Sequence, residues 1–260
     1  MVIYLHHVCL SAVALCDHNS VDGLYEFKKY AEEKQIEAVA GIEISAEYNG
    51  IEVHILGLFI PEDSYSNIKR LLDGVVREKE ESNRRLITSL KRAGYDVSYS
   101  DITEKYPNAK INRSHVAALL TEKGYTSSVN EAMKGILSQK SGYYVPPKRL
   151  SVMECIDFIA GIGAIAVLAH PFLNLGYEEL RKFLPEAIRH GLRGIECEYS
   201  EYNSETTVQA YALADEFDIL PSGGSDFHGT SKPAIKLGTG KGNLRVPYEW
   251  AIEMKNRAST

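Results

Sequence analysis

The 260-residue sequence lacks the features that mark several large classes of protein. Its four cysteines include no CxxC pair, which excludes the usual zinc-ribbon and dithiol redox patterns. They lie in or beside apolar segments, which favours buried thiols of a reduced, cytoplasmic protein over disulfides. No apolar run approaches the ~18 residues of a membrane-spanning helix. We also expect no secretory leader, because no charged-then-apolar segment with a cleavage site is visible.

The sequence also lacks a strong charge of either sign. With 29 Lys and Arg against 35 Asp and Glu, its formal net charge is −6. This mild acidity gives no general attraction to nucleic acid, although it leaves room for a local basic pocket. The length suits one large α/β domain, or a core domain with an insertion.

Short apolar runs alternate with helical patterns along most of the chain. This alternation predicts a mainly parallel sheet or a barrel, in which ligands bind at the carboxyl ends of the strands. The expected helices are Leu24–Lys34, Val152–Ala160, Tyr177–His190 and Ser204–Phe217. The expected strands are Val2–Leu5, Ser11–Cys16, Glu37–Ala40, Ile51–Phe59, Ala164–Ala169, Gly194–Glu198 and Ile219–Ser222.

The middle of the chain has a different pattern. Residues 66–94 form a long, highly charged helical pattern, and shorter helical patterns follow it. Pro107 and the pair Pro146-Pro147 mark turns between them. We therefore expect a core formed by residues 1–61 and 149–260, with a helical insertion domain at 62–148.

Residues that bind metals gather in or beside the ends of the expected strands. The carboxylate Asp226 and the imidazole His228 lie two residues apart on a glycine-rich turn, which can aim two ligands into one site. Further clusters occur at Cys16-Asp17-His18, Gly41-Ile42-Glu43 and Ala169-His170-Pro171, and His54 lies inside its run. So many clusters of these residue types predict a site for several metal ions.

The amino terminus contains a physical contradiction. Two adjacent parallel strands need a connection of a dozen or more residues, yet only five separate Leu5 from Ser11. Either the first strand does not pair in parallel with the second, or the helix that should join them is absent from this sequence.

These motifs together resemble the PHP superfamily, the polymerase and histidinol phosphatase group of metal-dependent phosphoesterases. The resemblance covers nearly the whole chain. The segments that carry it are Val13–Gly23, Ala40–Ser45, Val53–Gly57, Val167–Pro171 and Ser222–Gly229. Within the expected insertion, Asn112–Ala117 and Tyr144–Pro146 resemble the subgroup that acts on nucleotide phosphates, as does Lys232-Pro233 in the carboxyl-terminal segment.

The resemblance implies a distorted seven-stranded (β/α) barrel with two to three divalent ions, Mn²⁺, Zn²⁺ or Fe²⁺. Glu43 would bridge two ions, and Arg113, helped by His115, would bind the substrate phosphate. His18 or His228 would protonate the leaving oxygen. The full set of implied metal ligands is His6, His7, Asp17, His18, Glu43, His54, His170, Asp226 and His228.

The first motif departs from the family pattern. Tyr4-Leu5-His6-His7 runs almost directly into the next expected strand, and the aspartate of the family's loop has no counterpart. We therefore expect the third metal ion to be weakly held. Asp17 is ambiguous, because it either contributes a ligand, orients His18 or caps the helix that starts near Val21.

The expected activity is hydrolysis of phosphate monoesters of small nucleotides: a nucleoside monophosphate, a 3′,5′-bisphosphate or a short oligoribonucleotide end. Two alternatives stay open. The shortened amino terminus would also suit a degenerate scaffold that binds phosphorylated ligands without turnover. The second alternative is hydrolysis of histidinol phosphate. The expected insertion argues against it, because that segment resembles the subgroup that acts on nucleotide phosphates. We expect no membrane association and infer no protein partner.

Overall fold

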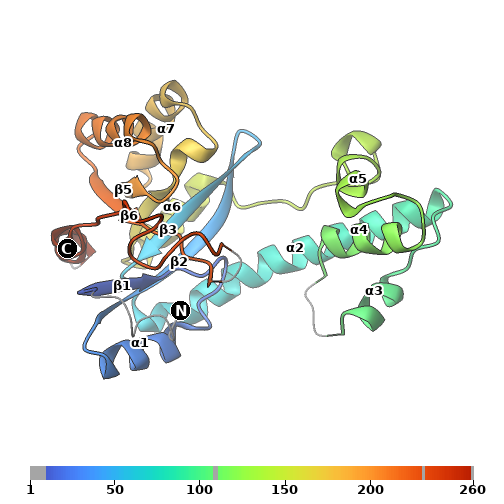
Figure 1. Cartoon of the computed structure of the whole chain (residues 1–260), viewed down its shortest axis with the longest axis horizontal. Coiled ribbons are helices and arrows are strands. Elements are labelled where there is room, and N and C mark those ends of the chain that lie inside the picture. Colours follow the sequence, from blue (N-terminus) through green and yellow to red (C-terminus); the bar gives the residue numbers. More distant parts are fainter. Residues whose placement is uncertain (1–9, 108–110, 230–231, 259–260) are drawn as a thin grey trace. The chain divides into compact units, whose positions relative to one another are not determined.

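A computed structural model describes residues 10–107, 111–229 and 232–258 of the chain. The chain divides into two compact units (Figure 1). The first unit comprises Met1–Lys69 and Leu150–Thr260, and the second comprises Arg70–Arg149. That the segment 62–148 is a separate insertion domain stays a prediction.

A curled sheet forms the centre of the first unit and resembles half of a barrel (Figure 1). Its strands lie side by side in chain order. The seventh expected strand, Val2–Leu5, lies outside the described residues. The six strands are β1 (Ala12–Leu15), β2 (Glu37–Tyr48), β3 (Ile51–Leu58), β4 (Ile165–Ala169), β5 (Leu192–Tyr199) and β6 (Leu220–Gly224).

One strand runs against the others. β3 pairs antiparallel with both β2 and β4, whereas the remaining neighbours pair in parallel. A two-residue turn causes the reversal: Tyr48 pairs with Ile51 across Asn49 and Gly50, whose φ angles are +51° and +81°. Positive φ at both turn residues is the arrangement that joins twisted antiparallel strands. The sheet is therefore mixed, and β2 continues eight residues beyond Ala40, where we expected it to end.

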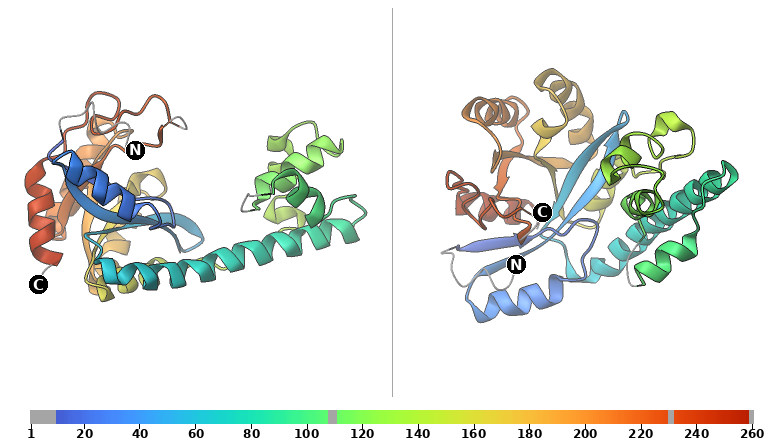
Figure 2. Two further views of the ribbon diagram at one scale, coloured as in Figure 1. Left: turned by 90° about the horizontal axis from the view of Figure 1, so that it is seen from below. Right: turned by 45° about the vertical axis from the view of Figure 1, so that its right-hand side comes forward.

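Most helices of this unit cover the outer face of the sheet (Figure 2), whereas the last one packs against the inner face, where Met254 joins Val39 and Val167. α7 shows why they pack there: it buries Leu180, Phe183, Leu184 and Ala187, which recur at the spacing of one helix face. Within the described ranges, no helix is both long and apolar enough to cross a membrane. The helices are α1 (Leu24–Glu33), α6 (Val152–Gly161), α7 (Tyr177–Arg189), α8 (Ser204–Glu216) and α9 (Tyr248–Ala258), with short 3₁₀ turns at Glu62–Ser64 and Pro171–Leu173.

The second unit is helical. α2 (Tyr65–Arg92) enters it from the first unit, and α3 (Tyr99–Lys105), α4 (Arg113–Glu122), α5 (Val129–Lys134) and a 3₁₀ turn at Gln139–Ser141 follow. The side chains of Ser98, Asn112 and Ser128 cap the three short helices, which satisfies backbone N–H groups that would otherwise lack partners. The unit has its own apolar core, built around Leu86, Leu90, Ile102, Val116 and Leu120.

Gly41 lies where β2 passes close to the end of β1 and the residue that follows it. A Cβ added there would lie 2.5 Å from Cys16 Sγ and 2.9 Å from the Leu15 carbonyl oxygen. We expect Gly41→Ala to lower the free energy of unfolding by about 1–3 kcal/mol, since the backbone contact cannot relax by rotating a side chain. Urea denaturation would measure this. Gly161→Ala is the matched control, because a Cβ there meets nothing within 4 Å, and a loss of the same size in both variants would contradict the crowding argument.

Candidate metal centre

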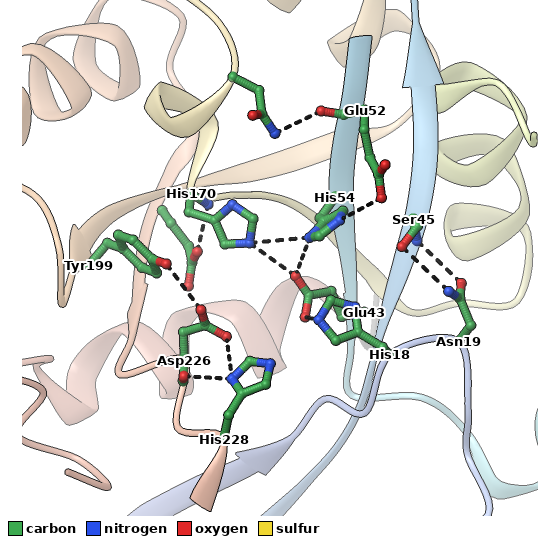
Figure 3. Close-up of polar contacts among 12 residues, drawn as sticks. His18, Asn19, Glu43, Ser45, Glu52, His54, His170, Tyr199, Asp226 and His228 are labelled. Carbon is green, nitrogen blue, oxygen red and sulfur yellow. Dashed lines mark hydrogen bonds and ion pairs between the residues drawn. The ribbon is translucent and has the colours of Figure 1, made fainter. Parts of the chain in front are cut away.

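The centre of the site is the buried carboxylate of Glu43, which is 4% exposed. Three imidazoles surround it (Figure 3). Its Oε1 lies 2.7 Å from His54 Nδ1 and 3.0 Å from His170 Nε2, while Oε2 lies 3.2 Å from His18 Nε2. One carboxylate therefore joins imidazoles from three different segments of the chain.

The mixed sheet explains how these segments meet. Because β3 runs antiparallel, its beginning lies at the same edge as the end of β4. His54, the fourth residue of β3, pairs with Ser45 on one side and with Ala169 on the other. His170 follows Ala169 directly. The antiparallel register of β3 therefore places His54 beside His170.

The loop after β1 holds His18 in place. His18 forms an isolated parallel bridge with Glu43, and the Asn19 backbone N–H donates to the Glu43 carbonyl at 2.8 Å. The Asn19 side chain also brackets Ser45, accepting from its backbone N–H at 3.2 Å (Figure 3). These contacts fix the loop against β2, so the His18 ring is held beside the carboxylate.

Two site residues have unusual backbone conformations. His170 has a φ of +27° and Asp226 a φ of +51°, a region that is strained for residues other than glycine. The His170 N–H donates to the buried Glu196 carboxylate at 2.7 Å, and Pro171 restricts the chain that follows. We interpret the unusual geometry as the cost of directing both side chains into the site.

A second cluster adjoins the first and centres on Asp226. Its Oδ2 accepts hydrogen bonds from Tyr199 Oη at 3.0 Å and from Lys232 Nζ at 2.6 Å. His228 Nδ1 lies 3.2 Å from Oδ1 and 2.8 Å from the Asp226 carbonyl oxygen. The His18 and His228 rings are 5.6 Å apart between centroids, so the two clusters form one continuous polar surface.

A cavity of about 890 Å³, which is large enough for a nucleotide, is lined by polar groups of both clusters: His18, Glu43, His170, Asp226 and His228. Apolar residues of the sheet and of α9, such as Val39 and Met254, line other parts of it.

The charges in the site are set by burial and by the imidazoles. Burial opposes ionisation of Glu43, but hydrogen bonds from His170 and His54 outweigh it and hold the pKa of this carboxyl well below its usual range. Burial lowers the pKa of His18, against the attraction of Glu43, which favours a neutral ring with a free lone pair. Burial also raises the pKa of Glu196 to about 7.

These donors suit a divalent cation. The ligand atoms of His18, Glu43 and His54 all lie within 4.8 Å of one another. His54 Nδ1 and His170 Nε2 are 3.3 Å apart and both face the same carboxylate oxygen, so a cation between them would satisfy two lone pairs and a charge together. Mixed imidazole and carboxylate ligands suit Mn²⁺, Zn²⁺ and Fe²⁺.

The structure brings most of the expected ligands to this edge of the first unit: His18, Glu43, His54, His170, Asp226 and His228. His6 and His7 lie outside the described residues. Asp17 is exposed and its carboxylate points toward Gly23, where an added Cβ would lie 3.3 Å from Oδ2. Its role as a ligand stays a prediction.

Arg113 and His115 lie in the second unit, at the start of α4. The Arg113 guanidinium lies over the Tyr144 ring, 4.4 Å from its centroid, and Nη1 donates to the Leu137 carbonyl. His115 Nδ1 accepts from the Asn112 N–H and completes the cap of the helix. His115 therefore has a structural task, whereas a role of either residue in substrate binding stays a prediction.

The alternating sequence pattern of β5 did not predict on which side of the sheet its acidic side chains lie. Alternation places Glu196 and Glu198 on one face, but the strand pairing shifts between them at a bulge. Glu196 turns toward His170, whereas Glu198 accepts from Tyr211 Oη of α8. The same irregularity brings Tyr199 to Asp226, and a sequence pattern of period two could not identify it.

No protein-family model matches the chain, but individual proteins do. It is 29% identical to a 5′-3′ exoribonuclease of Haemophilus influenzae over 220 residues, covering 84% of this chain and 80% of the relative. It is 25% identical to a 3′,5′-nucleoside bisphosphate phosphatase of Chromobacterium violaceum over 228 residues, covering 87% and 80%.

Solved structures give the same result for the fold. A crystal structure of a Bifidobacterium adolescentis protein described as a metal-dependent phosphoesterase matches with a TM-score of 0.71 and 26% identity. The match covers 98% of this chain and 89% of the other. The likeness therefore extends over both units rather than over the sheet alone.

Proposed function

We propose that this chain is a metal-dependent phosphoesterase of the PHP superfamily and that it hydrolyses phosphate monoesters of small nucleotides. The substrate would be a nucleoside monophosphate, a 3′,5′-bisphosphate or a short oligoribonucleotide end. The observation that carries this proposal is the buried Glu43 carboxylate with three imidazoles around it, at a strand edge that opens into a nucleotide-sized cavity.

Two or three divalent ions, Mn²⁺, Zn²⁺ or Fe²⁺, would be held here, and their chemistry is to polarise phosphoryl oxygens and to lower the pKa of bound water from about 15.7 toward about 7. In this proposal Glu43 would help to hold two ions, and His54 and His170 would hold one of them together with it. The other expected ligands are His6, His7, Asp17, His18, Asp226 and His228.

Other residues of the chain would prepare the site for catalysis. Glu196 fixes the backbone of His170, and Tyr199 and Lys232 fix the Asp226 carboxylate. Such outer contacts hold ligands in one orientation. His18 or His228 would donate the proton that the leaving oxygen requires. Arg113 would neutralise charge on the non-bridging phosphate oxygens.

Three cysteines of the described part, Cys16, Cys155 and Cys197, are free thiols. This supports our proposal that the protein works in a reducing compartment, the cytoplasm.

The test combines elemental analysis of the purified protein with phosphate release from four substrates: a nucleoside monophosphate, a nucleoside 3′,5′-bisphosphate, a 5′-phosphorylated oligoribonucleotide and histidinol phosphate. We expect at least two equivalents of metal per chain and phosphate release from a nucleotide substrate that a chelator abolishes. Protein without bound metal and without turnover would instead support the non-catalytic scaffold. Preferential release from histidinol phosphate would support the other alternative.

A further inference from the structure

The His54 ring lies between two carboxylates. Its Nδ1 lies 2.7 Å from Glu43 Oε1, on the side where the metal ions would bind. Its second nitrogen, Nε2, lies 3.4 Å from Glu52 Oε1 (Figure 3). The Glu43 side chain is 6% exposed and that of Glu52 is 44%, so the second carboxylate lies at the rim of the site rather than at its centre.

The sequence of β3 brings Glu52 to the ring. Side chains two residues apart on a strand point to the same face, and Glu52 precedes His54 by two. Val53 and Ile55 alternate with them on the opposite face, where both are buried. The carboxylate therefore lies beside the imidazole because of the strand geometry alone.

The backbone of Glu52 is fixed by the segment that carries His170. β4 ends at Ala169, which pairs with His54, so the strand pairing does not reach Glu52. Asn174 supplies a contact there, because its Nδ2 donates to the Glu52 carbonyl oxygen at 2.8 Å. This hydrogen bond joins the two segments that supply His54 and His170.

Neighbouring rings restrict how the His54 side chain can turn. It meets the rings of His18 and His170 edge to face, with ring centroids 5.1 and 5.0 Å apart, respectively. A neutral imidazole has a proton on one nitrogen and a lone pair on the other, and the hydrogen bond made by one nitrogen decides which. An acceptor at Nε2 therefore leaves the lone pair of Nδ1 available to a cation.

We propose that Glu52 is a positioning residue of the metal centre: it accepts the Nε2–H of His54 and so directs the Nδ1 lone pair toward the ion that His54 and His170 would hold. The proposal rests on the phosphoesterase function proposed above, and it adds a residue that would contact neither the ions nor the substrate. Outer carboxylates of this kind fix the orientation of metal-binding imidazoles and raise their basicity. Without Glu52, the neutral ring would keep its proton on Nδ1, where Glu43 accepts it.

Zn²⁺ binding, followed at individual histidines, tests this. The protein is labelled with ¹⁵N-histidine, and the side-chain NMR signals of His54 and His170 are recorded while Zn²⁺ is added against a competing chelator. We expect Glu52→Ala to weaken binding of the ion that these two rings hold by about 10- to 100-fold. Glu52→Gln keeps an acceptor oxygen and should recover part of this loss. In the Zn²⁺-loaded parent protein the His54 Nε2 proton should exchange slowly with water, whereas in Glu52→Ala it should exchange fast.

Glu47→Ala is the matched control. Glu47 is exposed and lies directly opposite Glu52 in the β2–β3 pair, whereas His54 lies opposite Ser45. The control removes the same charge from the same face of the sheet, and it should leave the Zn²⁺ affinity unchanged. Urea denaturation of the metal-free proteins should give both alanine variants similar stability, which separates positioning from folding.

An equal loss of affinity in Glu47→Ala would assign the effect to charge alone and would overturn the proposal. So would Zn²⁺ binding by Glu52→Ala as tight as in the parent, or a His54 proton that still exchanges slowly in that variant. Phosphate release from a nucleotide tests the phosphoesterase function separately. If the Zn²⁺ results are as expected but the parent hydrolyses no nucleotide, the function fails and the positioning role of Glu52 stands.

Discussion

Glu43→Gln should lose most of the bound metal and at least ~10²-fold of the phosphoesterase rate. The substitution keeps the size and one acceptor oxygen of the side chain, but it removes the charge. His18, His54 and His170 all contact this carboxylate, so the variant leaves three imidazoles without the anion that a pair of cations would share. Metal charge is a large part of transition-state stabilisation in such sites. Elemental analysis and initial rates of phosphate release measure the two effects.

The control for this variant is Glu47→Gln, which changes an exposed residue of the same strand. It should retain its metal and its rate. Circular dichroism of both proteins separates metal loss from unfolding. Unchanged metal content in Glu43→Gln would refute the bridging role, whatever the rate.

Arg113→Ala should lower kcat/KM for a nucleotide by about 30- to 1,000-fold while leaving the metal content unchanged. A charge-assisted, bidentate contact with a phosphate is worth roughly 2–4 kcal/mol when it is desolvated, and each ~1.4 kcal/mol is a factor of ten. Arg113→Lys should recover only part of this, because a point charge replaces a planar pair of donors. Steady-state kinetics with a mononucleotide are the measurement.

Arg84→Ala is the matched control, since Arg84 also lies over a tyrosine ring, at 3.9 Å from the centroid of Tyr99. Its guanidinium pairs with Glu80. Its charge is therefore already compensated, and we expect it not to bind a phosphate. Both variants lose a stacked guanidinium, and both should lose similar stability. If Arg113→Ala hydrolyses nucleotides as fast as the parent protein, Arg113 does not contact the phosphate.

The sequence predicted most of the elements because their signals are local. Amphipathic periodicity identified α7 and α8 almost to the residue, and short apolar runs identified the strands. The α9 helix, Tyr248–Ala258, was not predicted, although Pro247 and the residues after it suit a helix start. We expected β2 to end at Ala40, but it continues to Tyr48. The dipeptide Asn49-Gly50 is typical of a hairpin turn and indicates that strands flank it on both sides.

The candidate ligands could also be named from the sequence, because they lie in or beside short apolar runs and several of them occur as close pairs, such as Asp226 and His228. Their spatial relation could not. His54 and His170 are 116 residues apart, and they meet because β3 is reversed between two neighbours. Tyr199 reaches Asp226 because a bulge shifts the side chains of β5. Neither the reversal of β3 nor the bulge in β5 produces a periodic pattern of apolar and polar residues in the sequence.

Composition, local periodicity and motifs alone therefore determined the α/β class and the identity of the candidate metal ligands, since these depend on neighbours in the chain. The pairing of strands decided which carboxylate lies among which imidazoles, because contacts between distant residues depend on strand direction and register.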